Sequence, residues 1–300
     1  MKRWQIILAA AVCGLVLLLG VGLVWFSRVQ SLNLITQPMA GRSLPVDTPA
    51  KYALPYKDVT VTTRDGLKLV GWYIPPKNGA LVILQHGYKN NRSEMLNEAD
   101  MLYRHGYGLL ISSVRAHDYS EGERITFGIE EMKDLDAWYQ FVLTCSEVDP
   151  EKIGILGNSY GGMLAIDYAA QNKKIKAVAT NSAFSSLNDT VETSIRFFTG
   201  LPPFPFAPLI LFWGEQEAGF KASEIDATVW IKAISPRPVF LMQGGADTII
   251  STNSGQKLFD AAGEPKELWY DADVPHAQFD TLRAQEFEKR VVAFFDKYLH

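Results

Sequence analysis

The sequence predicts an α/β fold, built on a mostly parallel eight-stranded sheet with helices on both faces. Short apolar segments alternate with helical segments along most of the chain, which is the pattern of consecutive βαβ units. The strand-like segments of the second half are almost continuously apolar, as strands covered on both faces are expected to be. The chain has 300 residues, of which 47% are hydrophobic and 21% are charged. This composition suits one large domain with a short additional segment.

The chain begins with an uncharged apolar stretch of 22 residues, from Gln5 to Phe26. This stretch is long enough to cross a bilayer, which takes about 20 residues. Because no convincing small-x-small cleavage site follows, we expect an uncleaved anchor over residues 1–28 rather than a cleaved signal peptide. The basic start Met1-Lys-Arg3 predicts a cytoplasmic N-terminus, which places the rest of the chain outside the cytoplasm. Residues 29–55 contain clustered prolines and a glycine, and we expect them to form a linker.

Residues 56–300 are expected to form the α/β domain. The first two strands, at 57–63 and 67–74, flank a turn that contains Asp65-Gly66, which is typical of an antiparallel hairpin. The later strands are expected at 80–85, 108–114, 152–157, 175–181, 237–242 and 266–271. The helices are expected at 93–104, 130–144, 160–171, 253–262 and 280–298.

The most informative motif follows the fifth strand. Gly157-x-Ser159-x-Gly161 has the spacing of a nucleophile elbow, in which a serine occupies a sharp turn between a strand and a helix. The strained turn pushes the hydroxyl out of the sheet, and only small residues fit two positions before and after it. The helix that follows directs its free N–H groups toward the place where an oxyanion forms. We predict Ser159 as a nucleophile; an ordinary strand–helix turn is the alternative.

A serine nucleophile needs a base and an orienting acid, which follow an elbow serine in the order acid, then histidine. His276 is the predicted base, because the only other later histidine, His300, is the last residue. Asp247 is the predicted acid, because it alone follows a separate late strand. In this arrangement His276 accepts the Ser159 proton and Asp247 fixes the imidazole tautomer. Three rival carboxylates lie nearby in the sequence: Asp226, Asp271 and Asp273.

Two backbone N–H groups are expected to form an oxyanion hole. One belongs to Tyr160, directly after the nucleophile, and the other to Tyr88, in the loop after the third strand. Gly87 in the same loop allows a close approach of the backbone to a ligand. His86 is expected to brace the loop by hydrogen bonding rather than to transfer protons. The role of the Tyr88 side chain is left open at this point.

The chain runs for 55 residues from Ser182 to Pro236, between the sixth and seventh strands. This is too long for a plain crossover, so we expect a cap at about residues 183–235. The centre of the cap, 195–213, contains four prolines and five phenylalanines, which argue against one regular helix. Its apolar character predicts an acyl pocket. Two other interpretations stay open: the cap only packs onto the domain, or it dips toward the bilayer.

Composition disfavours several other classes of protein. With Lys2, Arg3 and Arg28 set aside, the chain carries 26 basic and 33 acidic residues, a net charge of −7 that is unsuited to nucleic acid. Of the two cysteines, Cys13 falls in the membrane segment and Cys145 at the end of a helix, so no disulfide is expected. Because no metal-ligand spacing occurs, neither a metal nor a cofactor is predicted.

From about Tyr56 to its C-terminus the chain resembles the alpha/beta-hydrolase superfamily. Within it, the chain is similar to the membrane-anchored ABHD acyl hydrolases and their bacterial relatives. The elbow and the His-Gly loop are shared across the superfamily, whereas the hairpin over 62–76 and the stretches 115–122 and 126–128 are more specific to this group. The resemblance implies the alpha/beta-hydrolase fold and serine hydrolase activity.

Two positions depart from the pattern of these relatives. Gln243 stands where a histidine often precedes the glycine ahead of the acid, and Asp118 stands where a glycine usually follows the histidine of the loop after strand four. Neither is a predicted triad position, so the departures bear on substrate preference more than on catalysis.

The predicted function is a membrane-anchored serine hydrolase. It would cleave a carboxylic ester or thioester of an apolar acyl group through an acyl-enzyme. A peptidase or amidase of the same fold is one alternative, since the same triad can attack amides. An alternative from another class is a catalytically inactive hydrolase fold that serves as a binding module.

Overall fold

The computed structural model describes residues 3–300. In this part of the chain, one eight-stranded sheet has the order β1-β2-β4-β3-β5-β6-β7-β8. β2 pairs antiparallel with β1 and β4, and every other neighbouring pair is parallel. The sheet predicted from the sequence is therefore confirmed. Its strands are β1 (Lys57–Thr62), β2 (Lys68–Ile74), β3 (Leu81–Gln85), β4 (Gly108–Ser112), β5 (Ile153–Asn158), β6 (Ala177–Asn181), β7 (Val239–Gly244) and β8 (Lys266–Asp271).

Helices cover both faces of the sheet and form two separate cores. One core joins the sheet to α2 and α10, and the other joins it to α3, α4 and α8. The helix expected at 93–104 is a short 3₁₀ turn followed by α2, and the one expected at 280–298 is divided into α9 and α10. The bounds of these helices are η3 (Arg92–Met95), α2 (Leu96–Arg104), α3 (Glu131–Leu143), α4 (Tyr160–Gln171), α8 (Ser254–Ala261), α9 (Phe279–Leu282) and α10 (Ala284–Leu299).

Burial along each strand follows the position of that strand in the sheet. All residues of β3, β5 and β6 are buried, in agreement with their continuous apolar sequences. The edge strands β1 and β8 have few buried positions and carry charged residues, because each has a neighbour on one side only. The carboxyl ends of the central strands therefore meet at one edge of a rigid, fully packed layer.

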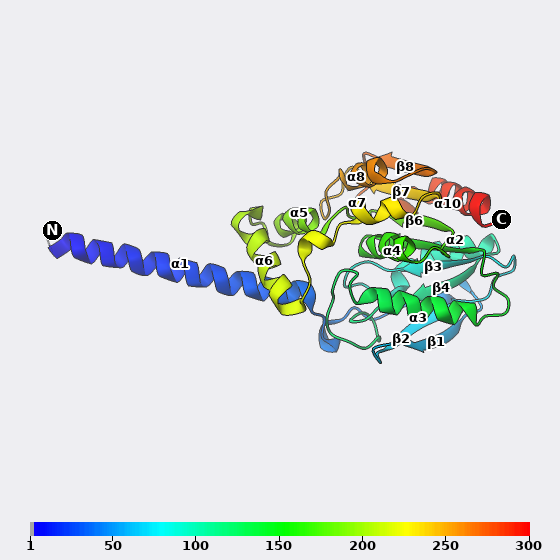
Figure 1. The fold of residues 1–300 in the computed structure, drawn as a ribbon, viewed down its shortest axis with the longest axis horizontal. Helices are drawn as coiled ribbons and strands as arrows, with labels where there is room; N and C mark the ends of the chain where they lie inside the picture. The colour runs from blue at the N-terminus through cyan, green and yellow to red at the C-terminus, as the bar shows by residue number, and fades with distance from the viewer. Residues whose placement is uncertain (1–2) are drawn as a thin grey trace.

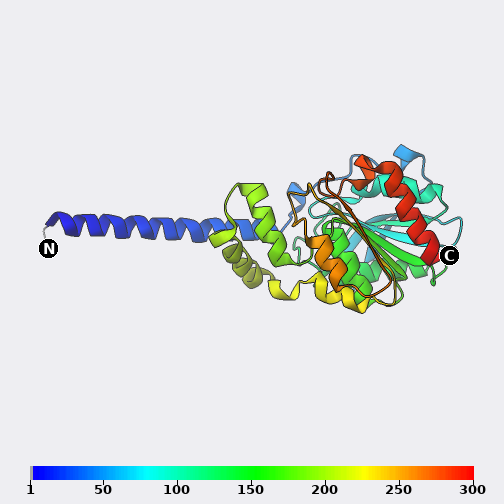
Figure 2. The ribbon, with the colours of Figure 1, turned by 90° about the horizontal axis from the view of Figure 1, so that it is seen from above.

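The N-terminal helix α1 (Arg3–Ile35) is the only helix of the described chain that is long and apolar enough by itself to cross a membrane. Its N-terminal part extends alone beyond the domain (Figures 1 and 2). The sequence predicts an anchor that ends at residue 28, but the helix continues to Ile35. It continues because Ser27, Ser31 and Ile35 are buried against the domain, with Ser31 and Ile35 facing Gly214.

The linker expected over residues 29–55 also differs from the structure. Its first seven residues belong to α1, and much of the rest lies on the domain. The Gln37 N–H donates to the Glu123 carbonyl at 2.8 Å. The Arg42 guanidinium donates to the carbonyl oxygens of Ser120 and Gly122. Two 3₁₀ turns complete the segment: η1 (Met39–Gly41) and η2 (Pro49–Tyr52).

The insertion between β6 and β7 is helical but irregular. Its two main helices, α5 (Leu187–Thr199) and α6 (Pro203–Ala218), meet at a bend of 115°. A kink at Phe204 and a proline at 208 interrupt α6, as the proline content predicted. α6 packs against the end of α1, and both views show the α5–α6 pair as the part of the domain nearest the free portion of α1 (Figures 1 and 2). The insertion continues through η4 (Ala222–Glu224), α7 (Ala227–Trp230) and η5 (Ile231–Ala233).

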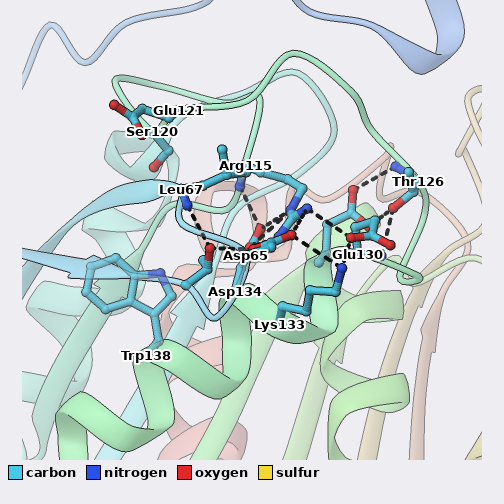
Figure 3. Close-up of polar contacts among 12 residues, drawn as sticks. Asp65, Leu67, Arg115, Ser120, Glu121, Thr126, Glu130, Lys133, Asp134 and Trp138 are labelled. Carbon is cyan, nitrogen blue, oxygen red and sulfur yellow. Dashed lines mark hydrogen bonds and ion pairs between the residues drawn. The ribbon is translucent and has the colours of Figure 1, made fainter.

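A charged network fixes the loop between β4 and α3 (Figure 3). Arg115 Nη2 donates to Asp134 Oδ1 at 2.7 Å, and its Nη1 donates to Asp65 Oδ2 at 3.0 Å. Further along the loop, the N–H and the hydroxyl of Thr126 donate to the two carboxylate oxygens of Glu131, each at 2.7 Å. The network joins the β1–β2 turn, this loop and α3.

Replacing Arg115 by methionine is expected to lower the free energy of unfolding by about 3–5 kcal/mol. The reason is that the Asp134 carboxylate, whose side chain is 0% exposed, would stay buried without its cation. Denaturant unfolding followed by tryptophan fluorescence measures the change.

The matched control is Arg104→Met, which breaks an exposed pair with Glu288. We expect it to cost about 1 kcal/mol or less. Equal losses in the two variants would show that the buried network contributes no more than a surface ion pair.

Candidate active site

The structure brings the three predicted triad residues together at the carboxyl edge of the sheet. Ser159 Oγ lies 2.7 Å from His276 Nε2, and His276 Nδ1 lies 2.7 Å from Asp247 Oδ2. The Asp247 side chain is fully buried, whereas that of His276 keeps 15% of its surface exposed. When Nδ1 donates to the carboxylate, Nε2 is left to accept the serine proton. This is the geometry that a nucleophile, a base and an orienting acid require.

The serine occupies a strained turn between β5 and α4. Its backbone has φ 53° and ψ −116°, a conformation that L-residues rarely adopt. The turn brings backbone segments so close that a Cβ at Gly157 would lie 2.2 Å from the Gly161 carbonyl oxygen. A Cβ at Gly161 would lie 2.2 Å from the Gln85 carbonyl oxygen. Both glycines are thus required by the close approach of the backbone, as the motif predicted.

The loops that carry the acid and the base are held by their own hydrogen bonds. Asp247 Oδ1 accepts the N–H groups of Ile249 and Ile250, at 2.9 and 3.0 Å, which leaves Oδ2 for the histidine. The N–H of Ala277, next to the histidine, donates to Ser182 Oγ at 3.0 Å. The loops after β6, β7 and β8 therefore fix the relay from three directions.

Two of the three rival carboxylates have other partners, and the third, Asp273, is exposed. Asp226 accepts the Thr228 N–H at the start of α7. Asp271 forms an ion pair with Arg283 at 2.7 Å, and it also accepts the N–H of Asp273. Asp247 is accordingly the carboxylate that the fold presents to the histidine.

Both predicted oxyanion donors belong to segments that adjoin the serine. Tyr160 is the first residue of α4, so its N–H precedes the helical hydrogen-bond ladder. Gly87, directly before Tyr88, approaches the serine so closely that a Cβ there would lie 3.6 Å from Ser159 Cβ. Neither Tyr88 N–H nor Tyr160 N–H has an acceptor within residues 3–300. Both groups are thus available to a ligand.

Three side chains hold the loop that contains Gly87 and Tyr88. His86 Nδ1 donates to the Gly87 carbonyl at 2.8 Å, which is the bracing contact expected of this residue. Burial lowers the pKa of His86 to about 4, so its ring is neutral. His117 Nε2 accepts the Lys89 N–H at 3.0 Å. Glu94 Oε2 accepts the Gly87 N–H at 2.8 Å.

The two departures from the pattern of the relatives are accommodated locally. Asp118 keeps a positive φ of 53°, the conformation that favours glycine, and its buried carboxylate pairs with Arg92 at 2.9 Å. Gln243 is buried, and its amide donates to the Gly244 carbonyl at 3.0 Å. Neither side chain replaces a member of the candidate triad.

Sequence reasoning did not identify His117, Glu94 or Glu98. Glu98 lies beneath the elbow, where its Oε1 accepts the Asn158 amide at 2.9 Å, and the side chain is fully buried. A signal was available in the sequence, because Glu98 occupies the apolar face of α2 three residues after Met95. Comparable signals for His117 and Glu94 were lacking, since their partners lie in other loops.

The α5–α6 insertion contains a cavity of about 510 Å³. Phe204, Leu211 and Phe212 supply its apolar lining, and Glu192 and Glu215 are on its wall. None of the three candidate triad residues lines this cavity. No group of three or more His, Cys, Asp or Glu side chains in the described chain is arranged to hold a metal ion.

Comparison with known proteins agrees with this architecture. The family model for the alpha/beta hydrolase fold matches residues 80–226. The protein Rv2307c of Mycobacterium tuberculosis, described as uncharacterized, is 28% identical over 261 residues, which cover 86% of this chain and 84% of the relative. The protein YfhR of Escherichia coli K12, also described as uncharacterized, is 26% identical over 247 residues, covering 79% and 80%.

Among solved structures, the chain is similar to the esterase Pf2001 of Pyrococcus furiosus. The superposition has a TM-score of 0.76 with 27% sequence identity, and it covers 89% of this chain and 99% of the esterase.

Stability is expected to depend on pH through Glu98. Burial, and secondarily the nearby Asp280 charge, raise the pKa of Glu98 to about 8 from an ordinary value near 4.5. A carboxyl group with a raised pKa stabilises the fold fully below its unfolded pKa, and this contribution is lost as the pH rises through 8. Glu98→Gln removes the ionisation, so the variant should exceed the wild type in unfolding free energy at pH 9 by about 2 kcal/mol or more. Denaturant unfolding at pH 5 and pH 9 measures this difference.

The control is Glu286→Gln on α10, whose half-exposed carboxylate pairs with Arg290. This variant should show no gain at pH 9. An equal pH dependence in Glu98→Gln and the wild type would contradict the assignment of a buried ionisation to Glu98.

Proposed function

Since this chain has the alpha/beta-hydrolase fold, we propose that it is a serine esterase that cleaves carboxylic esters or thioesters. The observation that carries the proposal is the continuous relay from Ser159 Oγ through His276 to Asp247, with two 2.7 Å contacts, at a strained elbow. The esterase among the structural neighbours supports the same class of reaction.

In the first half of the proposed reaction, Ser159 Oγ attacks the carbonyl carbon of the ester while its proton passes to His276 Nε2. The carbonyl π electrons move to oxygen, where the N–H groups of Tyr88 and Tyr160 stabilise the negative charge. Asp247 stabilises the imidazolium that has formed. When the carbonyl reforms, the bond to the leaving group breaks, and the alkoxide or thiolate takes the proton from His276. An acyl-enzyme remains on Ser159.

In the second half, water attacks the acyl carbon and gives a proton to His276. The tetrahedral intermediate forms at the same place and uses the same two N–H groups. The bond from the acyl carbon to Ser159 Oγ then breaks, and the oxygen recovers its proton from His276. The products are a carboxylic acid and the regenerated serine. In both halves the same histidine accepts a proton and later donates it, and this histidine is the residue in hydrogen-bond contact with the serine.

We also propose that α1 anchors the protein in a membrane and that the domain lies on the extracytoplasmic side. The apolar stretch of α1 is uncharged from Gln5 to Phe26, and basic residues precede it. The insertion that lies beside α1 exposes four large aromatic side chains, which is unusual for a water-facing helix pair. These are Phe197, Phe198, Phe204 and Phe212, with 50%, 67%, 79% and 49% of their surface exposed.

The aromatic surface and the membrane helix together favour an apolar acyl substrate. An ester carried by a lipid would reach this side of the domain directly from the bilayer. Amide cleavage by the same triad and an inactive binding fold are the two alternatives, and the experiments below separate them from esterase activity.

A fluorophosphonate probe should label the wild type, and Ser159→Ala should abolish the labelling, because the probe bonds to an activated serine oxygen. Asp247→Asn should retain the fold by circular dichroism but lower kcat by about 10⁴-fold, since the imidazole tautomer is no longer fixed.

The control is Ser146→Ala, an exposed serine outside the site, which should label like the wild type. A wild type that resists the probe would indicate a binding module, and full activity in Asp247→Asn would mean that another group orients His276.

Catalytic efficiency should rise with acyl length. From p-nitrophenyl acetate to the octanoate, kcat/KM should increase at least tenfold, because each buried methylene contributes up to about 0.8 kcal/mol. Initial rates in detergent below and above its micelle concentration measure the series.

The matching p-nitroanilides test the amidase alternative in parallel. An efficiency that does not rise beyond acetate would eliminate the apolar acyl site, and faster cleavage of anilides than of esters would favour the amidase.

A further inference from the structure

We propose that the last turns of α1 are a structural part of the candidate oxyanion hole, so that the active enzyme keeps this helix attached to the domain. The kinetic consequence rests on the proposed function, whereas the physical contact between α1 and the loop does not. The loop in question, residues 86–89, contains Tyr88 and is called the oxyanion loop below.

The side chains of two neighbouring residues of the oxyanion loop bind the C-terminal end of α1. Tyr88 Oη donates to the Leu34 carbonyl at 2.6 Å, and Lys89 Nζ donates to the Asn33 carbonyl. In return, the Gln37 amide donates to the Lys89 carbonyl at 3.4 Å. The last carbonyls of a helix have no partner within the helix, and this end of a helix favours a cation. The end of α1 thus supplies the acceptors that this loop uses.

The end of α1 is itself immobilised on the domain. Immediately after the helix, Thr36 forms an antiparallel bridge with Arg124, and the Ile125 N–H donates to the Ile35 carbonyl at 2.8 Å. Two helical turns earlier, Arg28 pairs with Glu217 of α6 at 2.8 Å. The acceptors for Tyr88 and Lys89 therefore lie on a helix end that two segments of the domain hold in place.

The contacts between the oxyanion loop and the end of α1 are called the clamp below. The Tyr88 ring connects this clamp to the elbow. The ring stacks on Phe127, with centroids 5.8 Å apart, and meets the edge of Tyr160 at 6.1 Å. Tyr160 carries the other proposed oxyanion donor. The Tyr88 side chain is partly buried, and its hydroxyl also reaches the neighbouring Asn33 carbonyl of α1, at 3.4 Å. Loss of the hydroxyl would remove both contacts with α1 and free the ring that packs against Tyr160.

The backbone at Lys89 explains why the loop needs support. Lys89 adopts a φ of 54°, in the left-handed region that is uncommon for a lysine. A strained residue persists only where its surroundings over-determine it. Here the Lys89 N–H is held by His117, the carbonyl by Gln37 and the side chain by Asn33. Two of these three contacts come from α1 and the segment directly after it.

The clamp distinguishes an anchor from a cleaved signal sequence. Removal of the chain through residue 37 would delete the acceptors for Tyr88 and Lys89 together with the Gln37 donor. It would also uncover the side of α6 that now packs on Ser27 and Ser31. A fragment that begins after this point lacks part of its own active-site support, so α1 belongs to the mature enzyme.

The test uses the full chain in lipid nanodiscs and compares two tyrosines whose hydroxyls are hydrogen-bonded. Tyr88→Phe removes the bond to Leu34, and Tyr107→Phe is the matched control because its hydroxyl bonds Asp296 at the same distance, 2.6 Å. With p-nitrophenyl acetate, we expect kcat to fall at least tenfold in Tyr88→Phe while KM changes less than twofold. The control should stay within twofold of the wild type in both constants. A parallel loss in both variants, or none in either, would overturn the kinetic consequence.

Hydrogen exchange tests the clamp without any activity. Peptides that cover residues 85–91 should exchange at least fivefold faster in Tyr88→Phe, and faster still in Tyr88→Phe/Lys89→Met, than in Tyr107→Phe. Equal exchange in all variants would overturn the proposal. If the wild type resists a fluorophosphonate probe, the proposed function fails, and exchange alone then decides whether α1 holds the loop. If the wild type is labelled but exchange is equal, only the present inference fails.

Discussion

The site depends on one constraint, the sharp turn that carries Ser159 between β5 and α4. The turn needs a positive φ at the serine and backbone contacts that exclude a side chain at Gly157 and Gly161. Such a conformation survives only where rigid structure surrounds it. Here β5 lies in the middle of the sheet, with every residue buried, and α4 is buried along most of its length. The fully packed centre of the domain thus holds the strain that aims one hydroxyl out of the sheet.

Parallel strands make the convergence of distant residues possible. Since the carboxyl ends of neighbouring parallel strands share an edge, the loops after β3, β5, β6, β7 and β8 meet there. Several of these loops contain residues with positive φ, among them Lys89, Ser182 and Ala277, and each is tied to a neighbouring loop by a hydrogen bond at or beside the strained residue. The loops therefore support one another, and several such hydrogen bonds together hold Ser159 and His276 in contact.

Much of this arrangement could be predicted from the sequence. The buried strands are continuous apolar runs, and Ser159, Asp247 and His276 occur in the order and in the strand–loop context that an elbow requires. The remainder depends on contacts that no local pattern encodes. The apolar run before Arg28 predicts a helix end there, but α1 continues because Arg28 meets Glu217 and because α6, almost 190 residues later, covers Ser31. No sequence pattern identifies His117 and Glu94 for the same reason, since each forms its hydrogen bond with a residue of a different loop.

The packing of α1 on α6, with its Arg28–Glu217 pair, has a geometric consequence. A flexible tether lets a domain take many orientations and distances relative to its attachment point. A helix that continues without a break into the body of the domain fixes both the distance and the orientation instead. In the proposed membrane-bound state, this helix would hold Ser159 at one height above the lipid plane. Ser159 would then meet substrates by lateral diffusion in two dimensions, and the height of a scissile bond above the surface would decide which substrates react.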